Sequence, residues 1–126
     1  MEITQPLLEI RDLTVTFGTG KHSTVVVNGV SFTVNRGKTL GVVGQSGSGK
    51  TTLARAIMQL IPTTAGRTTF DGVNLASLRP KELRAFRRRM QMVFQDPGGS
   101  LNEYMRVGSI ITEPLLVHGI ASGAEL

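Results

Sequence analysis

The 126-residue chain contains no cysteine and no tryptophan, and it has a single tyrosine. The absence of cysteine excludes disulfide bonds and thiolate metal sites, and it fits a reducing cytosol. No apolar run approaches the roughly 20 residues that a membrane-spanning helix needs. The first residues, Met1 to Pro6, lack the features of a secretory signal peptide. From these absences we expect a small globular protein.

Acidic residues are the scarcer kind of charge, with 9 aspartates and glutamates against 14 lysines and arginines, for a net charge of +5. This excess favours anionic partners at long range. Much of it falls between Arg79 and Arg89, so we expect its effect to be local. At this length the chain forms one domain at most, with a modest hydrophobic core.

One glycine-rich stretch matches the phosphate-binding pattern G-x-x-x-x-G-K-[ST]. Glycines let backbone N–H groups converge on phosphate oxygens, and a following helix directs its positive dipole end at the same anion. In this pattern Lys50 is the mobile charge for the β- and γ-phosphates, and the Thr51 hydroxyl is a ligand for Mg²⁺. The stretch and the residue after it comprise Gly44, Gln45, Ser46, Gly47, Ser48, Gly49, Lys50, Thr51 and Thr52.

The flanking residues supply the context that this pattern requires. Residues 39–43 are a short apolar run that predicts a strand entering the loop. Apolar residues then recur at helical spacing from Leu53 to Ile61, and Pro62 ends the predicted helix. The alternative is a glycine-rich turn that merely joins a strand to a helix. The order of strand, loop and helix favours a nucleotide site.

Three short strands, antiparallel to one another, are predicted before the phosphate loop. Residues 7–17 alternate between apolar and polar, with a one-residue slip at Arg11 and Asp12 that indicates a bulge. A second run at 24–27 and a third at 30–34 are separated by Asn28 and Gly29, a tight-turn signal.

After Pro62 we expect a strand at 67–70, followed by a turn at Asp71 and Gly72. A helix is expected within 78–89, with Pro80 in its first turn. A strand at 90–94 and an apolar segment at 107–117, interrupted by Pro114, follow. In the helix we expect Leu83 and Phe86 to form a buried pair. His22 and His118 are isolated and lack metal-ligand spacing, so no chemistry is assigned to them.

Taken together, these motifs resemble the N-terminal portion of an ATP-binding-cassette (ABC) ATPase, most closely the subunits that power dipeptide and oligopeptide importers. The resemblance implies an α/β fold, with a partial P-loop nucleoside-triphosphatase core and an N-terminal antiparallel β-subdomain. It rests on residues 30–52, 70–72 and 87–97, and it continues through 100–102, 107–108 and 113–115. It divides the chain into a β-subdomain (about 7–38), the P-loop strand and helix (about 39–61), a Q-loop region (about 90–105) and the start of a helical subdomain (about 106–126).

The resemblance also implies ligands and roles for two further residues. ATP and Mg²⁺ are the expected ligands. Gln95 corresponds to the Q-loop glutamine, which reaches Mg²⁺ and the attacking water and so has a catalytic role; its amide oxygen can ligate while its NH₂ donates. Phe17 corresponds to the aromatic residue that stacks on adenine. The alternative for Phe17 is that it is the last inward-facing residue of a strand.

The family resemblance implies partners as well. A second ATPase subunit, in a homo- or heterodimer, would help to sandwich ATP, and transmembrane permease subunits would dock on residues 98–105 at the cytoplasmic face of the membrane. Gly98, Gly99, Glu103 and Tyr104 depart from the commoner pattern there. Arg87, Arg88 and Arg89 could suggest nucleic-acid binding, but cations at a helix end complement its dipole, and we expect no nucleic acid.

Several elements of a complete cassette ATPase do not occur in the sequence. There is no apolar run ending in Asp-Glu (Walker B), no Leu-Ser-Gly-Gly-Gln signature and no switch histidine. We therefore expect a fragment truncated before the signature helix and Walker B, whose complete protein hydrolyses ATP to power peptide import. One alternative is a nucleotide-binding or docking module that does not hydrolyse. Another is a cassette protein acting on ribosomes or DNA, which the stretch after Gln95 disfavours. The transported substrate is not encoded here.

Overall fold

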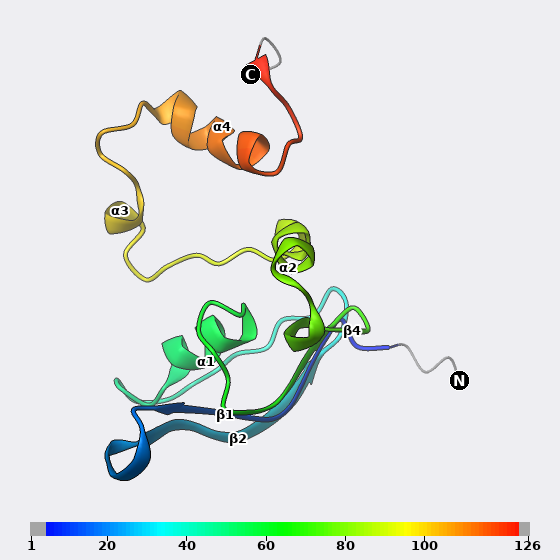
Figure 1. Cartoon of the computed structure of the whole chain (residues 1–126), viewed down its shortest axis with the longest axis vertical. Coiled ribbons are helices and arrows are strands. Elements are labelled where there is room, and N and C mark those ends of the chain that lie inside the picture. The colour runs from blue at the N-terminus through cyan, green and yellow to red at the C-terminus, as the bar shows by residue number, and fades with distance from the viewer. Residues whose placement is uncertain (1–4, 124–126) are drawn as a thin grey trace. The chain divides into compact units, whose positions relative to one another are not determined.

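The computed structural model describes residues 5–123, which form two compact units that divide between Leu83 and Arg84 (Figure 1). Each unit is described by itself. No helix within residues 5–123 is long and apolar enough to cross a membrane. The first unit contains β1 (Leu8–Phe17), η1 (Gly20–His22), β2 (Thr24–Val34), α1 (Lys50–Ile57), β3 (Ala65–Phe70), β4 (Val73–Asn74) and η2 (Leu75–Ser77). α2 (Pro80–Phe86) crosses the division, and the second unit contains η3 (Arg87–Arg89), α3 (Pro97–Ser100) and α4 (Val107–Val117).

The first unit is built on a four-stranded antiparallel sheet in the order β2-β1-β3-β4. β1 is a central strand because it pairs with both β2 and β3. The predicted bulge is confirmed, since the register shifts between Ile10 and Leu13 and Asp12 adopts a φ of 48°. The Asp12 N–H donates to Ser31 Oγ at 2.8 Å, so β2 satisfies a backbone group that the bulge takes out of the ladder.

The predicted pair of strands at 24–27 and 30–34 is wrong, because both runs belong to one strand, β2. Asn28 and Gly29 do not turn the chain back. Gly29 takes a φ of 60° inside the strand, and its N–H donates to Thr14 Oγ1 at 3.0 Å. The register shifts here between the Leu13–Val30 and Val15–Val27 pairs. The left-handed residue that would serve a tight turn therefore serves a second bulge.

The strands predicted at 39–43 and 90–94 do not form in the structure. Their β-prone side chains are largely exposed, with Val43 at 97% and Val93 at 89% of full exposure. A strand requires a hydrogen-bonded neighbour, and within residues 5–123 no strand pairs with either segment. The composition of these segments predicted strands. They do not form because no neighbouring strand within residues 5–123 pairs with them.

Helix α1 ends four residues earlier than predicted, at Ile57 rather than Ile61. Gln59 adopts a φ of 53°, and its N–H donates to the Ala56 carbonyl at 3.0 Å. The Leu60 N–H donates to the Arg55 carbonyl at 2.9 Å. This pair of hydrogen bonds is a Schellman motif, which closes the helix before Pro62 can.

The remaining predictions are confirmed in outline. Asp71 and Gly72 form the turn between β3 and β4, with φ values of 50° and 78°. Pro80 begins α2, where the Arg79 N–H donates to Glu82 Oε2 at 2.8 Å and the contact with Arg79 lowers the pKa of Glu82. The expected buried pair of Leu83 and Phe86 is only half-buried.

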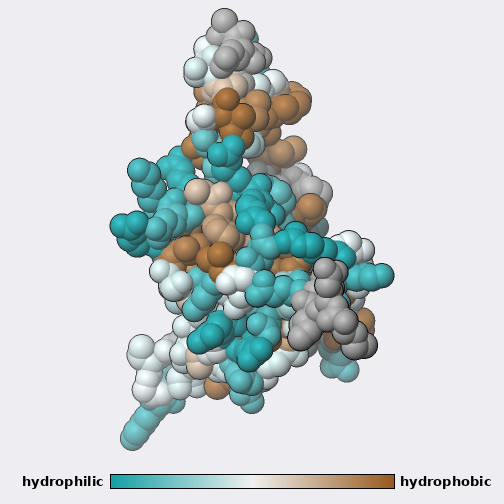
Figure 2. Space-filling model, turned by 90° about the vertical axis from the view of Figure 1, so that its right-hand side faces the viewer, coloured by the Kyte–Doolittle hydropathy of each residue, from teal (hydrophilic) through white to brown (hydrophobic). Residues whose placement is uncertain are grey.

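In the second unit the apolar segment predicted at 107–117 forms a helix, α4, which continues through Pro114. Apolar residues lie all round α4. Figure 2 shows several brown, apolar areas on the face of the molecule that it presents. The α4 side chains of Val107, Ile111 and Leu116 are each more than half exposed. Of the predicted helical subdomain at 106–126, residues 124–126 lie outside the described part.

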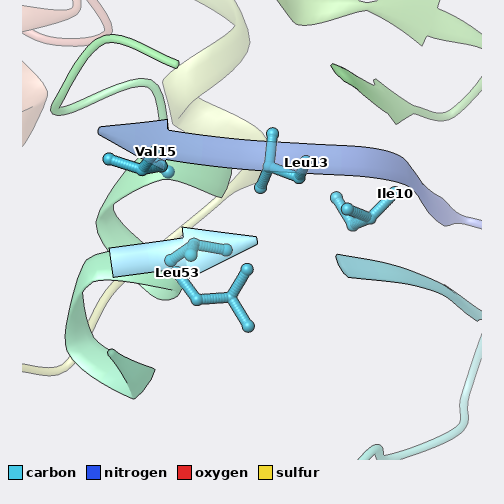
Figure 3. Packing of buried hydrophobic residues seen from close by; sticks show 6 residues of the cluster. Ile10, Leu13, Val15 and Leu53 are labelled. Atoms are coloured by element: carbon cyan, nitrogen blue, oxygen red, sulfur yellow. The ribbon is translucent and has the colours of Figure 1, made fainter. Parts of the chain in front are cut away.

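The core of the first unit joins α1 to the sheet. Figure 3 shows Ile10, Leu13 and Val15 on β1 with Leu53 of α1 beside them. Val27 of β2 and Ala56 of α1 complete this buried cluster. Burying an aliphatic side chain contributes about 1.5–3 kcal/mol, so these few residues hold the start of α1 against β1 and β2.

A buried hydroxyl in β3 gives a test of how this sheet is stabilised. Thr68 is 1% exposed, and its Oγ1 has no hydrogen-bond partner among the described residues. Replacing it in Thr68→Val removes an unpaired polar group while keeping nearly the same shape. We expect the free energy of unfolding to rise by about 1 kcal/mol, measured by urea denaturation followed by circular dichroism. Thr69→Val, at the half-buried next position, is the control and should change stability by less than about 0.5 kcal/mol. A loss of stability in Thr68→Val would contradict the expectation.

Candidate functional site

The phosphate-binding pattern forms a compact loop at the start of α1. Gly47 and Gly49 adopt φ values of 78° and 92°, which side chains rarely allow, and Gly49 caps the helix. The Ser48 N–H donates to the Gln45 carbonyl at 3.2 Å, and the Leu53 N–H donates to the Gly49 carbonyl at 2.8 Å. The loop therefore turns directly into α1, whose first N–H groups face the space that the loop encloses.

The Lys50 ammonium lies against the inside of this loop. Its Nζ donates to the carbonyl of Gly44 at 2.6 Å and to that of Gln45 at 2.7 Å, and it lies 3.4 Å from Ser48 Oγ. No carboxylate is an ion-pair partner of Lys50 among the described residues. Its positive charge therefore meets only neutral carbonyl and hydroxyl groups and stays available to an anion.

Two glycines of the loop have a close neighbour at the position that a Cβ would take. A Cβ at Gly44 would lie 2.5 Å from Ser48 Oγ. A Cβ at Gly49 would lie 2.7 Å from the carbonyl oxygen of Val26, so β2 supports the loop from behind. The loop is thus held both by its own hydrogen bonds and by the edge of the sheet.

A cavity of about 310 Å³ opens beside the loop. The lining residues from β2, α1 and the segment just before the loop are mostly apolar. Those from the loop itself are mostly polar. The residues that line the cavity are Val26, Val27, Asn28, Val30, Val42, Val43, Gly44, Ser48, Gly49, Lys50 and Leu53. Such a cavity suits a ligand with an anionic end and a less polar body.

Sequence reasoning identified the loop residues of this cavity but not the residues of β2. Val26 and Asn28 line it although they precede the loop by about twenty positions. A valine run and an Asn-Gly pair carry no signal of a site by themselves. Their role depends on the contact between Gly49 and Val26, which only the fold reveals.

The other predicted residues of the first unit lie at the same end of the sheet as the loop. Thr51 and Thr52 are in the first turn of α1, where Thr51 is exposed and Thr52 half-buried. Phe17 is the last residue of β1, is paired with Thr24 and is 47% exposed. Its ring is therefore only partly covered, unlike those of the core residues.

Gln95 belongs to the second unit, in a bend before α3, and its side chain is exposed. Asp96 Oδ1 accepts from the Gly99 N–H at 3.2 Å and caps α3. Tyr104 is 99% exposed. Within residues 5–123 no three acidic or histidine side chains lie together as a metal site would require.

The packing of Gly49 on β2 predicts different costs for two neighbouring substitutions. Gly49→Ala and Gly47→Ala both place a side chain on left-handed backbone, which costs about 1–2 kcal/mol. A Cβ at Gly47 meets nothing within 4 Å, whereas one at Gly49 meets the Val26 carbonyl. We expect Gly49→Ala to lower the free energy of unfolding more than Gly47→Ala does, as measured by urea denaturation. Equal losses would show that the contact with β2 is unimportant.

Comparison with known proteins places this site in a family. Residues 27–112 match the family model described as ABC transporter. A Brucella ovis protein named as a peptide import ATP-binding protein is 45% identical over 120 residues, which cover 95% of this chain and 38% of that protein. The oligopeptide transport ATP-binding protein OppF of Streptococcus mutans is 44% identical over 113 residues, which cover 89% of this chain and 37% of that protein. The chain thus spans less than two-fifths of the length of these relatives.

Solved structures confirm the fold class that the sequence predicted. A dimeric ATP-binding cassette in a post-hydrolysis state, bound to ADP and Pi, has a TM-score of 0.78 at 24% identity, over 94% of this chain and 51% of that chain. The ATP-binding subunit of an ABC transporter has a TM-score of 0.71 at 25% identity, over 92% of this chain and 44% of that chain. The described fold is therefore part of an α/β cassette of the P-loop type.

Proposed function

This chain belongs to the ABC transporter family, and from that premise we propose that it binds ATP as the nucleotide-binding part of an importer ATPase. The observation that carries the proposal is the phosphate loop with Lys50 inside it. The ammonium is held by the Gly44 and Gln45 carbonyls within 2.7 Å and has no carboxylate partner among the described residues. The N-terminus of α1 adds its N–H groups at the same place.

The cavity next to the loop supports a nucleotide rather than a simple anion. Its apolar wall includes Val26, Val30 and Leu53, and its volume of about 310 Å³ is at the lower end of small-molecule sites. Phe17, at the end of β1, offers a partly exposed ring on which a base can stack, worth about 1–3 kcal/mol. The triphosphate would lie at Gly44 to Thr52, and the base would lie toward Phe17.

Mg²⁺ would enter with the triphosphate. Mg²⁺ in such sites takes few protein ligands and completes its shell with phosphate oxygens and water. The exposed Thr51 hydroxyl in the first turn of α1 is an oxygen donor that fits this role. When bound, the ion would neutralise charge on the phosphates. For Gln95, in the second unit, we propose separately the metal-ligating role that the family resemblance implies, and its side chain is exposed.

The partners follow from the family and the relatives. We propose that the complete protein hydrolyses ATP as one of two ATPase subunits, homo- or heterodimeric, at the cytoplasmic face of the membrane. Transmembrane permease subunits would dock on residues 98–105, where Tyr104 is exposed. Dipeptides or oligopeptides are the proposed cargo, because both relatives above are named for peptide transport.

A second function, nucleotide binding without hydrolysis, is favoured for these 126 residues by themselves. The sequence contains no apolar run ending in Asp-Glu that could supply the acidic metal ligand and polarise water. The described residues likewise bring no group of acidic side chains together. In this case the loop would bind ATP and leave it intact.

Nucleotide binding is tested with two variants whose effects should differ. Lys50→Ala removes a charge that meets only the β- and γ-phosphates, so ATP and ADP should bind at least tenfold more weakly while AMP and adenosine are unchanged. Phe17→Ala removes stacking on the base, so all four ligands should bind more weakly. Isothermal titration calorimetry on the 126-residue chain measures both. If Phe17→Ala leaves every affinity unchanged, Phe17 does not stack on the base.

Hydrolysis is tested by phosphate release from the same chain, purified free of other ATPases. We expect ATP to bind without sustained turnover, because the acidic ligand and the residues of a second subunit are needed for the reaction. Lys50→Ala, which lacks the phosphate-binding charge, is the control for contaminating activity. Sustained turnover that disappears in Lys50→Ala would rule out the non-hydrolysing alternative.

A further inference from the structure

Strand β2 contains a bulge close to the phosphate loop. Val30 of β2 pairs with Leu13 of β1, and the next pair is Val27 with Val15. β2 therefore advances three residues where β1 advances two, which leaves one extra residue at 28–29. We call this irregularity the Gly29 bulge.

The Gly29 bulge decides which side chains of β2 face the core. Side chains alternate between the two faces of a strand, so Val30 and Val27 would lie on opposite faces of a regular strand. Both nevertheless face the core, because Val27 is 4% exposed and Val30 packs against the same buried cluster. Without the extra residue, Asn28 would lie opposite Val15, and Val27 would turn outward. The packing of β2 under α1 therefore requires the bulge.

A further shift of register gives Val26 its contact with the phosphate loop. The register shifts again between Val15 and Thr16, and Val26 has no counterpart among the described residues of β1. A Cβ at Gly49 would lie 2.7 Å from the Val26 carbonyl oxygen and 3.4 Å from its Cγ1. Val26 also lines the cavity beside the loop. The path of β2 over residues 26–29 thus sets the surface on which the loop packs.

A hydroxyl on β1 holds the Gly29 bulge in place. Gly29 has a φ of 60°, and its N–H donates to Thr14 Oγ1 at 3.0 Å. The hydroxyl supplies the acceptor that the regular ladder would otherwise provide for this N–H. Thr14 is itself held on its other side, because its carbonyl accepts from the Thr64 N–H at 2.8 Å. Thr14 is therefore a fixed point between β2 and the start of β3.

We propose that Thr14 is a positioning residue for the phosphate loop, acting through the Gly29 bulge and the Val26 carbonyl. This inference rests on the proposed ATP binding and adds to it a residue that does not line the cavity. With the bulge formed, Val26 supports Gly49 from behind, and the first N–H groups of α1 keep their direction. With the bulge lost, the phosphates meet a less ordered loop. Adenosine has no phosphate and does not depend on the bulge.

The first test compares Thr14→Val, which removes the hydroxyl and keeps the shape, with Thr14→Ser, which keeps the hydroxyl. Calorimetry on the full 126-residue chain measures the affinities for ATP, ADP and adenosine. We expect Thr14→Val to bind ATP and ADP about three- to tenfold more weakly, the loss expected from one hydrogen bond. Adenosine should bind unchanged, and Thr14→Ser should bind both nucleotides within about twofold of wild type. A general loss of folded structure would instead weaken adenosine in parallel.

Ser31→Ala is the matched control, because it removes a hydroxyl that holds the other bulge, at Asp12. Ser31 Oγ accepts from the Asp12 N–H at 2.8 Å and donates to Asp12 Oδ1 at 3.2 Å. Neither residue lines the cavity. Ser31→Ala should therefore leave the affinity for ATP within about twofold of wild type, even where it lowers stability.

Two substitutions of Gly29 test the same bulge from the other strand, and they decide the outcome if Thr14→Val does not fold. A Cβ at Gly29 meets nothing within 4 Å, so the φ of 60° is the constraint on this position. Asparagine tolerates left-handed backbone, whereas the β-branched valine resists it. We expect Gly29→Asn to bind ATP within about twofold of wild type, and Gly29→Val to lose at least as much affinity as Thr14→Val.

The loop itself is followed through the backbone amide signals of Gly47, Gly49 and Lys50 in proton–nitrogen NMR spectra without nucleotide. These signals should shift in Thr14→Val and stay in place in Thr14→Ser and Ser31→Ala. The proposal is overturned if they do not shift in Thr14→Val, if Ser31→Ala weakens ATP equally, or if adenosine weakens as much as ATP. If the wild-type chain binds no ATP, the proposed function fails, and the amide signals still show whether Thr14 positions the loop.

Discussion

The packing of α1 against β1 and β2 is the interaction on which the site depends. Leu53 and Ala56 are buried in one cluster with Leu13, Val15 and Val27. Each large aliphatic side chain there contributes about 1.5–3 kcal/mol, which is a substantial part of the roughly 5–15 kcal/mol that stabilises a domain. Because Leu53 lies one turn after Lys50, fixing Leu53 also fixes the first turn of the helix and the direction of its N–H groups. The phosphate loop has its geometry because a small core lies beneath it.

The loop itself adds constraints that an ordinary turn would not need. Gly49 is left-handed and lies against the Val26 carbonyl, and Gly44 leaves room for the Ser48 hydroxyl. The Lys50 ammonium bridges the Gly44 and Gln45 carbonyls at the other side of the same turn. Backbone that would be strained with side chains is thereby held in one conformation, with its charge already in place. A binding site preorganised in this way loses little conformational entropy when an anion arrives.

The sequence predicted the local parts of this arrangement well. The slip in alternation at Arg11 and Asp12 predicted a bulge, and the glycine spacing predicted the loop at the start of a helix. Both features follow from interactions between residues near in the chain. The Schellman end of α1 at Gln59 was missed because glutamine rarely takes the left-handed position that glycine prefers.

Features that depend on distant partners were the ones that sequence could not predict. Asn28 and Gly29 have the composition of a hairpin turn, but pairing with β1 over its whole length made them a bulge instead. Residues 39–43 have the composition of a strand, but strand formation depends on a neighbour that residues 5–123 do not provide. The contact between Gly49 and Val26 could likewise not be predicted, because it joins positions 23 apart that share no motif.

The distinction between contacts local in the sequence and contacts with distant segments also separates phosphate binding from the hydrolysis proposed for the complete protein. Binding requires a loop, a lysine and a helix start, which are contiguous from Gly44 to Thr52, together with a sheet edge that holds them. Hydrolysis requires in addition an acidic metal ligand and groups that stabilise the transferring phosphoryl, and these come from remote segments or other subunits. The first set is assembled in the first unit by contacts that the structure describes. Under the proposed function, ATP affinity and ATP turnover would therefore report on different parts of the complete protein.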